Sequence, residues 1–245
     1  MKLSILYDNR RLAAPFKAAW GFSCLIGTDL LFDTGGDFDT LCRNARAMKI
    51  DLGKIRHIVI SHNHWDHTGG LWGLLKRHKG IRVYLCPRFG KALPDKIRRA
   101  GSIPITVQGW KTLRAGICLT AQMIGQHKGK PIAERSLVIS SANRLVIITG
   151  CAHAGVMEIV RAVKTKFSGR KIAFLAGGLH LKDMNETQIR QTVKSLRASG
   201  VQRLMACHCT GAKALNVIQK VYGRNSRMIK AGNKIKVFIE GALCD

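Results

Sequence analysis

Residues 61–70, with the sequence SHNHWDHTGG, hold four potential metal ligands within six positions. His62 and His64 lie two residues apart on a segment that we expect to be extended, so their side chains point to the same side and can share one ion. Asp66 and His67 follow where we expect a helix to begin, and they can bind a second ion. Imidazole and carboxylate ligands suit zinc, and also iron or manganese. The segment therefore predicts a metal centre with one or two ions.

Two histidines do not complete the coordination of a metal ion, so the fold has to bring in further ligands. Three more histidines lie near the carboxyl ends of predicted strands: His153 comes shortly after residues 145–149, His180 shortly after 172–176, and His208 directly after 203–207. Open α/β sheets collect their ligands at the carboxyl ends of strands. We predict His153 and His208 as metal ligands and keep His180 as a further candidate. His57, His78 and His127 receive no site role.

Apolar β-rich runs alternate with helical patterns along the chain, which favours an α/β fold. The predicted strands are residues 3–7, 22–26, 30–32, 57–60, 82–86, 137–140, 145–149, 172–176, 203–207 and 235–239. Five helices are predicted. The first comes after Gly36 with Asp37 or Asp39 as its cap, and the second follows the metal motif. The third contains Val156 to Val163, the fourth begins at Asn185 with Gln188 in a capping box, and the fifth contains Leu215 and Ile218. Residues 87–130 give only a weak pattern. No linker divides the chain, so we predict one domain over residues 1–245. Its second half repeats the first in outline, and an internal duplication is a hypothesis.

Charge is the most unusual global property: 41 Lys and Arg against 14 Asp and Glu give a formal net charge of +27. The segment Thr68 to Ala133 has 13 basic residues and one acid, and Thr187 to Ile239 has 11 and none. An anionic partner is one interpretation, and a strongly basic solvated surface is the other. The oligomeric state is not predicted.

Eight cysteines occur in the chain, yet the first eleven residues show no apolar export signal, so we expect reduced thiols and a cytoplasmic protein. No apolar run is long enough to span a membrane. The cysteines to which we assign no chemistry are Cys24, Cys42, Cys86, Cys118 and Cys244.

The chain resembles the metallo-β-lactamase superfamily, because its His-x-His-x-Asp-His signature is matched by residues 62–67. It is similar to a branch related to 7,8-dihydropterin-6-methyl-4-(β-D-ribofuranosyl)aminobenzene-5′-phosphate synthase. The segments that carry this similarity are Leu6-Tyr7-Asp8-Asn9, Gly21-Phe22-Ser23, Gly150-Cys151-Ala152-His153-Ala154-Gly155, Gly177-Gly178-Leu179-His180-Leu181 and His208-Cys209-Thr210-Gly211.

The resemblance implies a four-layer αββα sandwich in which two mixed β-sheets are flanked by helices. It implies that His62, His64 and His153 bind the first metal. Asp66, His67 and His208 would then bind the second, while Asp33 supports the ligands from behind. One departure concerns the second metal: Gly177-Gly178 stands where many superfamily hydrolases have a bridging Asp. His180 then either replaces that ligand or contacts substrate, and a weak or empty second site is a further hypothesis.

The predicted activity is that of a metal-dependent hydrolase or synthase acting on a small anionic, phosphorylated metabolite. A metal with an open position lowers the pKa of bound water to about 7 or acts as a Lewis acid on a leaving group. In hydrolysis Asp66 would orient the water. In the synthase, which the resemblance alone implies, pyrophosphate leaves a pterin while an aryl ribose phosphate adds. Asp66 and His180 are the catalytic candidates.

Candidate substrate contacts are Trp20, which could instead belong to the core, and the segment Cys209-Thr210-Gly211. Thr210-Gly211 could open a helix whose amides receive a phosphate, or Gly211 could simply permit a turn. Two alternatives of other classes remain: a metallo-nuclease, and a basic nucleic-acid-binding protein with a structural metal. Binding to nucleic acid would fall steeply with salt, whereas chelation would unfold a protein whose metal is structural.

Overall fold

The computed structural model describes residues 1–141 and 143–237, and the chain divides into two compact units. Within these residues unit 1 comprises 1–108 and 230–237, and unit 2 comprises 109–229. The prediction of a single domain over residues 1–245 stays a prediction. Among the described residues, no helix is both long and apolar enough to cross a membrane.

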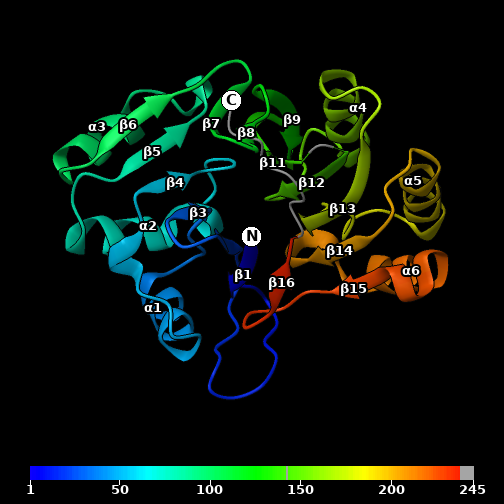
Figure 1. Ribbon diagram of the computed structural model, residues 1–245, viewed down its shortest axis with the longest axis horizontal. Helices are drawn as coiled ribbons and strands as arrows, with labels where there is room; N and C mark the ends of the chain where they lie inside the picture. The colour runs from blue at the N-terminus through cyan, green and yellow to red at the C-terminus, as the bar shows by residue number, and fades with distance from the viewer. Residues whose placement is uncertain (142, 238–245) are drawn as a thin grey trace. The chain divides into compact units, whose positions relative to one another are not determined.

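Unit 1 contains a mixed seven-stranded sheet (Figure 1). In order across the sheet its strands are β16 (Lys234–Lys236), β1 (Lys2–Tyr7), β2 (Ser23–Ile26), β3 (Leu30–Phe32), β4 (His57–Val59), β5 (Arg82–Leu85) and β6 (Ile103–Thr106). The first four are antiparallel neighbours, and β3 to β6 are parallel. The helices are α1 (Phe38–Ala47), α2 (Trp65–Arg77) and α3 (Ala92–Arg99), with short 3₁₀ turns at Leu52–Lys54 and Pro87–Phe89. These parallel connections bring the ends of β3 and β4 to one edge.

Unit 2 contains a second mixed seven-stranded sheet. Across the sheet its strands are β7 (Lys111–Arg114), β8 (Ile117–Leu119), β11 (Leu137–Ser140), β12 (Arg144–Thr149), β13 (Lys171–Gly178), β14 (Leu204–Cys207) and β15 (Ser226–Met228). A separate hairpin consists of β9 (Met123–His127) and β10 (Lys130–Glu134). The helices are α4 (Val156–Lys166), α5 (Glu186–Ala198) and α6 (Ala212–Tyr222), with 3₁₀ turns at His208–Thr210 and Gly223–Asn225.

The two sheets have the same succession of strand directions. In each, three antiparallel pairings are followed by three parallel ones, and each parallel pairing is bridged by one helix. The hairpin β2–β3 thus corresponds to β11–β12, and helices α1 to α3 correspond to α4 to α6. Residues that follow β3 and β4 in unit 1 therefore take the same topological places as residues that follow β12 and β13 in unit 2.

Helix α4 illustrates how sequence pattern sets packing. Its apolar residues Val156, Ile159 and Val163 recur at helical spacing, as predicted, and all three are buried in one cluster with residues of β12 and β13. The opposite face carries charged residues such as Glu158 and Arg161, which form an exposed pair. Burial of such a stripe stabilises the helix far more than its intrinsic propensity does.

Most predicted elements are present near their predicted positions. Asp37, rather than Asp39, caps α1, because its carboxylate accepts from the Thr40 amide at 2.7 Å. The weakly patterned residues 87–130 fold into α3 and strands β6 to β9. The last strand, predicted over residues 235–239, is described as Lys234–Lys236, and the rest of that prediction beyond residue 237 lies outside the described residues.

Trp20 corrects one expectation. We considered a core role for it, but the residue is 44% exposed. It precedes Gly21, which has φ +143° and whose amide donates to the Asn9 side chain at 3.0 Å. Because the buried strand begins only after this bend, the large apolar ring of Trp20 remains outside.

Asn185→Ala should destabilise the protein by about 1 kcal/mol, because Asn185 and Gln188 form a reciprocal capping box at the start of α5. The measurement is denaturant unfolding followed by circular dichroism. Asn185→Asp keeps the oxygen acceptor and is the matched control. An equal loss in both variants would contradict a role of the cap.

Candidate metal centre

The metal motif spans the connection between β4 and α2 in unit 1. His64 has extended backbone angles (φ −103°, ψ 152°) and is the residue just before α2. Asp66 and His67 lie in the first turn of that helix, as predicted. His62 and His67 are fully buried, and Asp66 is 7% exposed. The connection thus presents His62 in a bend rather than on the predicted extended segment, His64 in extended conformation, and an Asp-His pair on the helix.

Asp33 organises this motif from the end of β3. Its carboxylate accepts from the Ser61 amide at 2.7 Å, from the Ser61 hydroxyl at 2.6 Å, and from Nδ1 of His67 at 2.7 Å. Asp33 is fully buried and has φ +57°, a conformation that strains a residue other than glycine. The predicted support of the ligands by Asp33 corresponds to these contacts.

These hydrogen bonds assign the tautomers of two histidines. A carboxylate only accepts, so His67 donates from Nδ1 and keeps a lone pair on Nε2. Ser61 has one hydroxyl hydrogen, which goes to Asp33, so its oxygen accepts from Nδ1 of His62 at 2.9 Å. His62 therefore also has its lone pair on Nε2. One buried carboxylate leaves both Nε2 atoms in the form that binds metals.

The donor atoms of unit 1 fit a metal ion. Nε2 of His62 lies 3.1 Å from Nδ1 of His64. Two nitrogens on one tetrahedral zinc are about 3.3–3.4 Å apart, given bonds of ~2.0–2.1 Å. Nε2 of His67 and Oδ2 of Asp66 form a second pair, 3.7 Å apart. Nitrogen and carboxylate oxygen form a ligand set that suits zinc, iron or manganese.

In unit 2 the predicted histidines lie at the ends of three parallel strands. His153 follows β12, His180 follows β13, and His208 follows β14. The register pairs Thr149 with Gly177 and Gly178 with Cys207, so these strands end at the same edge of the sheet. His180 and His208 have φ of +50° and +49°. Backbone strain at strand ends is a feature of functional sites, and here it coincides with predicted site residues.

Glu134, at the end of β10, holds the loop that carries His153. Its carboxylate accepts from the amides of Cys151, Ala152 and His153 at 3.0, 2.8 and 2.5 Å. Burial raises the pKa of Glu134 to about 7, although these amides act in the opposite direction. Sequence reasoning missed Glu134, since a single acid among apolar and basic residues has no motif. The one available signal was its position three residues before the strand predicted over residues 137–140.

The turn after β14 contains Cys209 and Thr210. The Cys209 thiol donates to the Cys151 carbonyl (3.6 Å) and is hydrogen-bonded with His180. Burial opposes ionisation of Cys209, but hydrogen bonds from Cys151 and His180 and the charge of His208 hold the pKa of this thiol well below its usual value. The bond with Cys209 raises the pKa of His180, against the effect of burial. Sulfur and imidazole atoms of Cys151, His208 and Cys209 lie within 4.8 Å of one another.

Thr210 and Gly211 link this turn to its neighbours. The Thr210 hydroxyl donates to the Cys207 carbonyl at 2.7 Å and accepts from the Leu179 amide at 3.2 Å. Gly211 precedes α6 with φ +82°, and a Cβ there would come within 2.8 Å of the Lys182 backbone. Gly211 therefore permits both the turn and a close approach, while a substrate role of Cys209, Thr210 and Gly211 stays a prediction.

His127 was assigned no role, yet it lies at the end of β9 next to predicted site residues. Its ring centroid is 5.3 Å from that of His153 and 6.2 Å from that of His180. The hairpin signal Lys128-Gly129 was present in the sequence and would have placed His127 at a strand end. His57 is hydrogen-bonded to Tyr84, and His78 lies at the end of α2, so the prediction that neither has a site role is unchanged.

Comparison with known proteins adds independent findings. A family model for the β-lactamase superfamily domain matches residues 28–209. The chain is 28% identical to the 7,8-dihydropterin-6-methyl-4-(β-D-ribofuranosyl)-aminobenzene-5′-phosphate synthase of Methanocaldococcus jannaschii, over 91% of this chain and 92% of the relative. It is 26% identical to an uncharacterized protein of the same organism, over 93% of this chain and 99% of the relative.

Among solved structures, Tm1679, a metal-dependent hydrolase of the β-lactamase superfamily, matches with a TM-score of 0.82 and 26% identity. The match covers 97% of this chain and 99% of that one. The predicted fold class, two mixed β-sheets flanked by helices, is confirmed by this match and by the two sheets described above.

Asp33→Asn should weaken metal binding by about 10–100-fold, because the amide nitrogen of Asn cannot accept from Ser61 or His67. Competition with a chromophoric chelator measures this affinity. Asp39→Asn, at an exposed position of α1, is the control. Equal affinities for both variants would show that Asp33 does not tune the ligands.

Glu134→Gln should destabilise the protein by about 1–3 kcal/mol, because one buried amide of the 151–153 loop would face the Gln amide instead of an oxygen. Hydrogen exchange should also accelerate at residues 151–153. Glu158→Gln, an exposed change on α4, is the control. Unchanged exchange in the Glu134 variant would contradict the anchoring role.

Proposed function

Because the chain belongs to the β-lactamase superfamily, we propose that it is a metal-dependent enzyme that acts on a small anionic, phosphorylated, pterin-related metabolite. Phosphate or diphosphate is the leaving group, and the acceptor is water or the amine of an aryl ribose phosphate. The single observation that carries the proposal is the network in which Asp33 and Ser61 leave His62 and His67 with Nε2 lone pairs.

The proposed ligands in unit 1 are His62, His64, Asp66 and His67, and those proposed in unit 2 are His153 and His208. Zinc suits these donors best, since imidazole nitrogens predominate among them. When bound, the metal supplies a Lewis acid that stabilises negative charge on a departing phosphate.

The chain's own groups orient the reaction. The side chain of Asp66 is about 10% exposed on the first turn of α2, so its carboxylate can hold a proton of the attacking water or amine. Asp33 stays behind the ligands, fully buried, and keeps their rings in place. Asp33 is hydrogen-bonded to Ser61 and to His67, the residue next to Asp66, so these contacts fix the relative positions of the two carboxylates.

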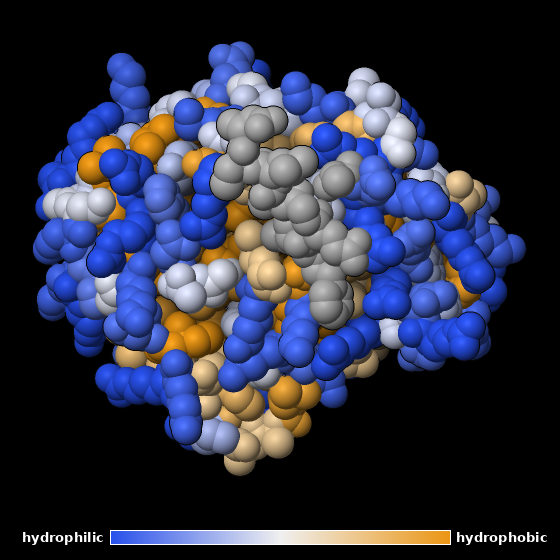
Figure 2. Space-filling view, viewed as in Figure 1, coloured by the Kyte–Doolittle hydropathy of each residue, from blue (hydrophilic) through white to orange (hydrophobic). Residues whose placement is uncertain are grey.

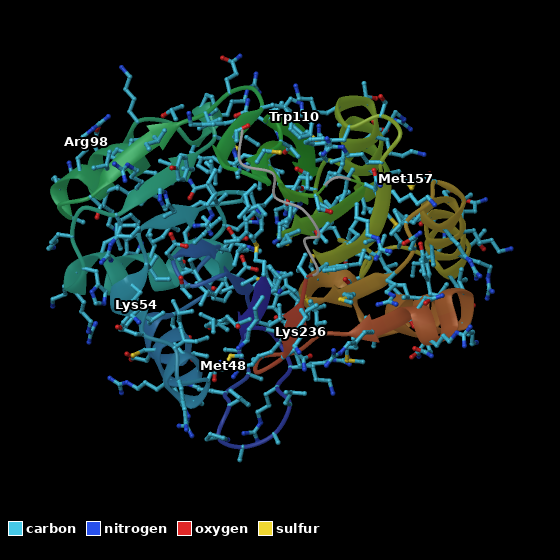
Figure 3. The ribbon with its side chains drawn as sticks, viewed as in Figure 1. Met48, Lys54, Arg98, Trp110, Met157 and Lys236 are labelled. Carbon is cyan, nitrogen blue, oxygen red and sulfur yellow. The ribbon has the colours of Figure 1, made fainter. Side chains whose placement is uncertain are left out.

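The substrate class rests on similarity and charge. A relative that shares 28% of its residues over nearly the full length of both chains is named as a synthase of a dihydropterin compound with a ribose phosphate. A net charge of +27 attracts such anions. Figure 2 shows hydrophilic side chains over most of the face in view, and Arg98 extends from α3 with 62% of its side chain exposed (Figure 3). Part of the charge is thus ordinary solvated surface.

A specific surface supports nucleic acid as the alternative partner. Four cations line a hollow beside α5 and α6 in unit 2, namely Arg190, Lys194, Arg197 and Lys220. Glu186 pairs with Arg190, and within the described part of the chain no acidic side chain forms an ion pair with the other three. A hollow of this kind attracts polyphosphate chains, and nucleic acid therefore belongs in any assay of this protein.

Removal of metal should abolish turnover and leave the fold intact. Metal content is measured by elemental analysis of protein purified without added metal, and release of phosphate or diphosphate is followed with and without the arylamine acceptor. His64→Ala should lower both metal content and turnover, the latter at least about 100-fold as for loss of a transition-state interaction. His78→Ala, at the other end of α2, is the matched control.

Three outcomes would contradict the proposal. They are an absence of metal under any loading, unfolding by chelator alone as expected for a structural metal, and cleavage of nucleic acid in place of the small phosphate compounds. Dependence of diphosphate release on the amine identifies transfer, and independence identifies hydrolysis.

A further inference from the structure

Three imidazoles of unit 2 converge on one point. His127 ends β9, His153 lies in the loop after β12, and His180 follows β13. One nitrogen of each lies within 4.8 Å of the other two. The rings of His153 and His180 are closest, with centroids 4.2 Å apart. Residues far apart in sequence thus form a compact cluster of nitrogen donors.

The backbone around this cluster is held in place. Glu134 receives three successive amides of the His153 loop. Gly125, two residues before His127, is so close to this loop that a Cβ would lie 2.2 Å from the His153 carbonyl carbon. The β9–β10 hairpin therefore lies directly against the loop, and any larger residue at position 125 would separate them. The donors are fixed by packing before any ligand arrives.

His180 provides the observation that points to a ligand. Its Nδ1 is buried and has no hydrogen-bond partner among the described residues. Its ring is hydrogen-bonded with Cys209, so that bond uses the other ring nitrogen. In the neutral imidazole, the nitrogen that donates to Cys209 carries the one ring hydrogen, so Nδ1 has a lone pair, and metal-binding histidines typically donate their second N–H in this way. An unsatisfied buried acceptor destabilises the fold, and a bound cation would remove that cost.

We propose that His127, His153 and His180 together bind one divalent transition-metal ion of the zinc type. Three histidines and an open fourth position are a known arrangement of catalytic zinc. The inference rests on the proposed function in that His153 is also a proposed ligand there, but the ion inferred here is held by His127, His153 and His180 of unit 2 alone.

The nitrogens of the three histidines have to move slightly closer together to bind one ion. Nitrogens on one tetrahedral zinc are about 3.3–3.4 Å apart, against separations of up to 4.8 Å in the cluster. His127 is half-buried beside the exposed turn Lys128-Gly129, so its side chain can rotate to close the difference. The Cys209 sulfur is not a ligand of this ion, because it is hydrogen-bonded to the ring of His180.

The test is a titration of the full-length protein with Co²⁺, followed by its visible absorption, together with elemental analysis. Loss of a group behind a ligand costs about 10–100-fold in affinity, so loss of the ligand itself should cost at least about 100-fold. His127→Ala and His180→Asn should each show this loss and a changed spectrum. Asn tolerates the φ of +50° at position 180 better than Ala. Gln126→Ala, the exposed neighbour of His127, is the matched control.

The outcomes separate this inference from the proposed function. Unchanged affinity and spectrum in folded His127→Ala and His180→Asn, with loss in His64→Ala, would overturn the inference alone. Loss in the His127 and His180 variants, with full metal retained in His64→Ala, would support the inference and overturn the unit 1 centre. Intact metal with weakened inhibition by inorganic diphosphate would assign His127 and His180 to substrate and also overturn the inference. Circular dichroism excludes unfolding as the cause of any loss.

Discussion

The buried carboxylate of Asp33 is the interaction on which the candidate centre of unit 1 depends. It joins the end of β3 to the start of the β4–α2 connection through Ser61, and to the first turn of α2 through His67. A fully buried charge is costly unless it receives several hydrogen bonds, and three donors meet that requirement. The same donors determine which nitrogen of each histidine keeps its lone pair. Folding and preparation of the ligands are thus one event.

Strand ends supply nearly every other group of interest. Asp33 and His208 follow strands directly, His180 comes two residues after β13, and all three have positive φ. A strand that must stop and turn sharply leaves its last side chain facing away from the sheet, where it can meet a ligand. Both units contain the same order of hairpin and parallel crossovers, so each produces this edge by the same route.

Much of the fold was predictable because its signals are local. The stripe Val156, Ile159 and Val163 indicated α4, and Asn185 with Gln188 marked the start of α5. The dense motif of residues 61–70 likewise needed only spacing. Glu134 and His127 were missed because their importance comes from a hairpin that packs on a loop distant in sequence, although Lys128-Gly129 did mark the turn of that hairpin. Trp20 failed for a related reason: apolarity indicates burial only when neighbouring elements provide a surface to cover the ring. The ligand roles themselves stay predictions.

The contact between the β9–β10 hairpin and the His153 loop also bears on how this part of the chain moves. Gly125 lets the hairpin approach, and Glu134 ties it down through three amides, so neither segment can leave without breaking the attachment of the other. Local opening here should therefore be a single cooperative event, as in a foldon, and not the independent fraying of two loops. An insertion at the exposed turn Lys128-Gly129 would lengthen the hairpin without disturbing the contacts of Gly125 and Glu134 with the His153 loop. Variation at that turn is thus a route by which related chains can alter the surroundings of a histidine cluster while its backbone stays in place.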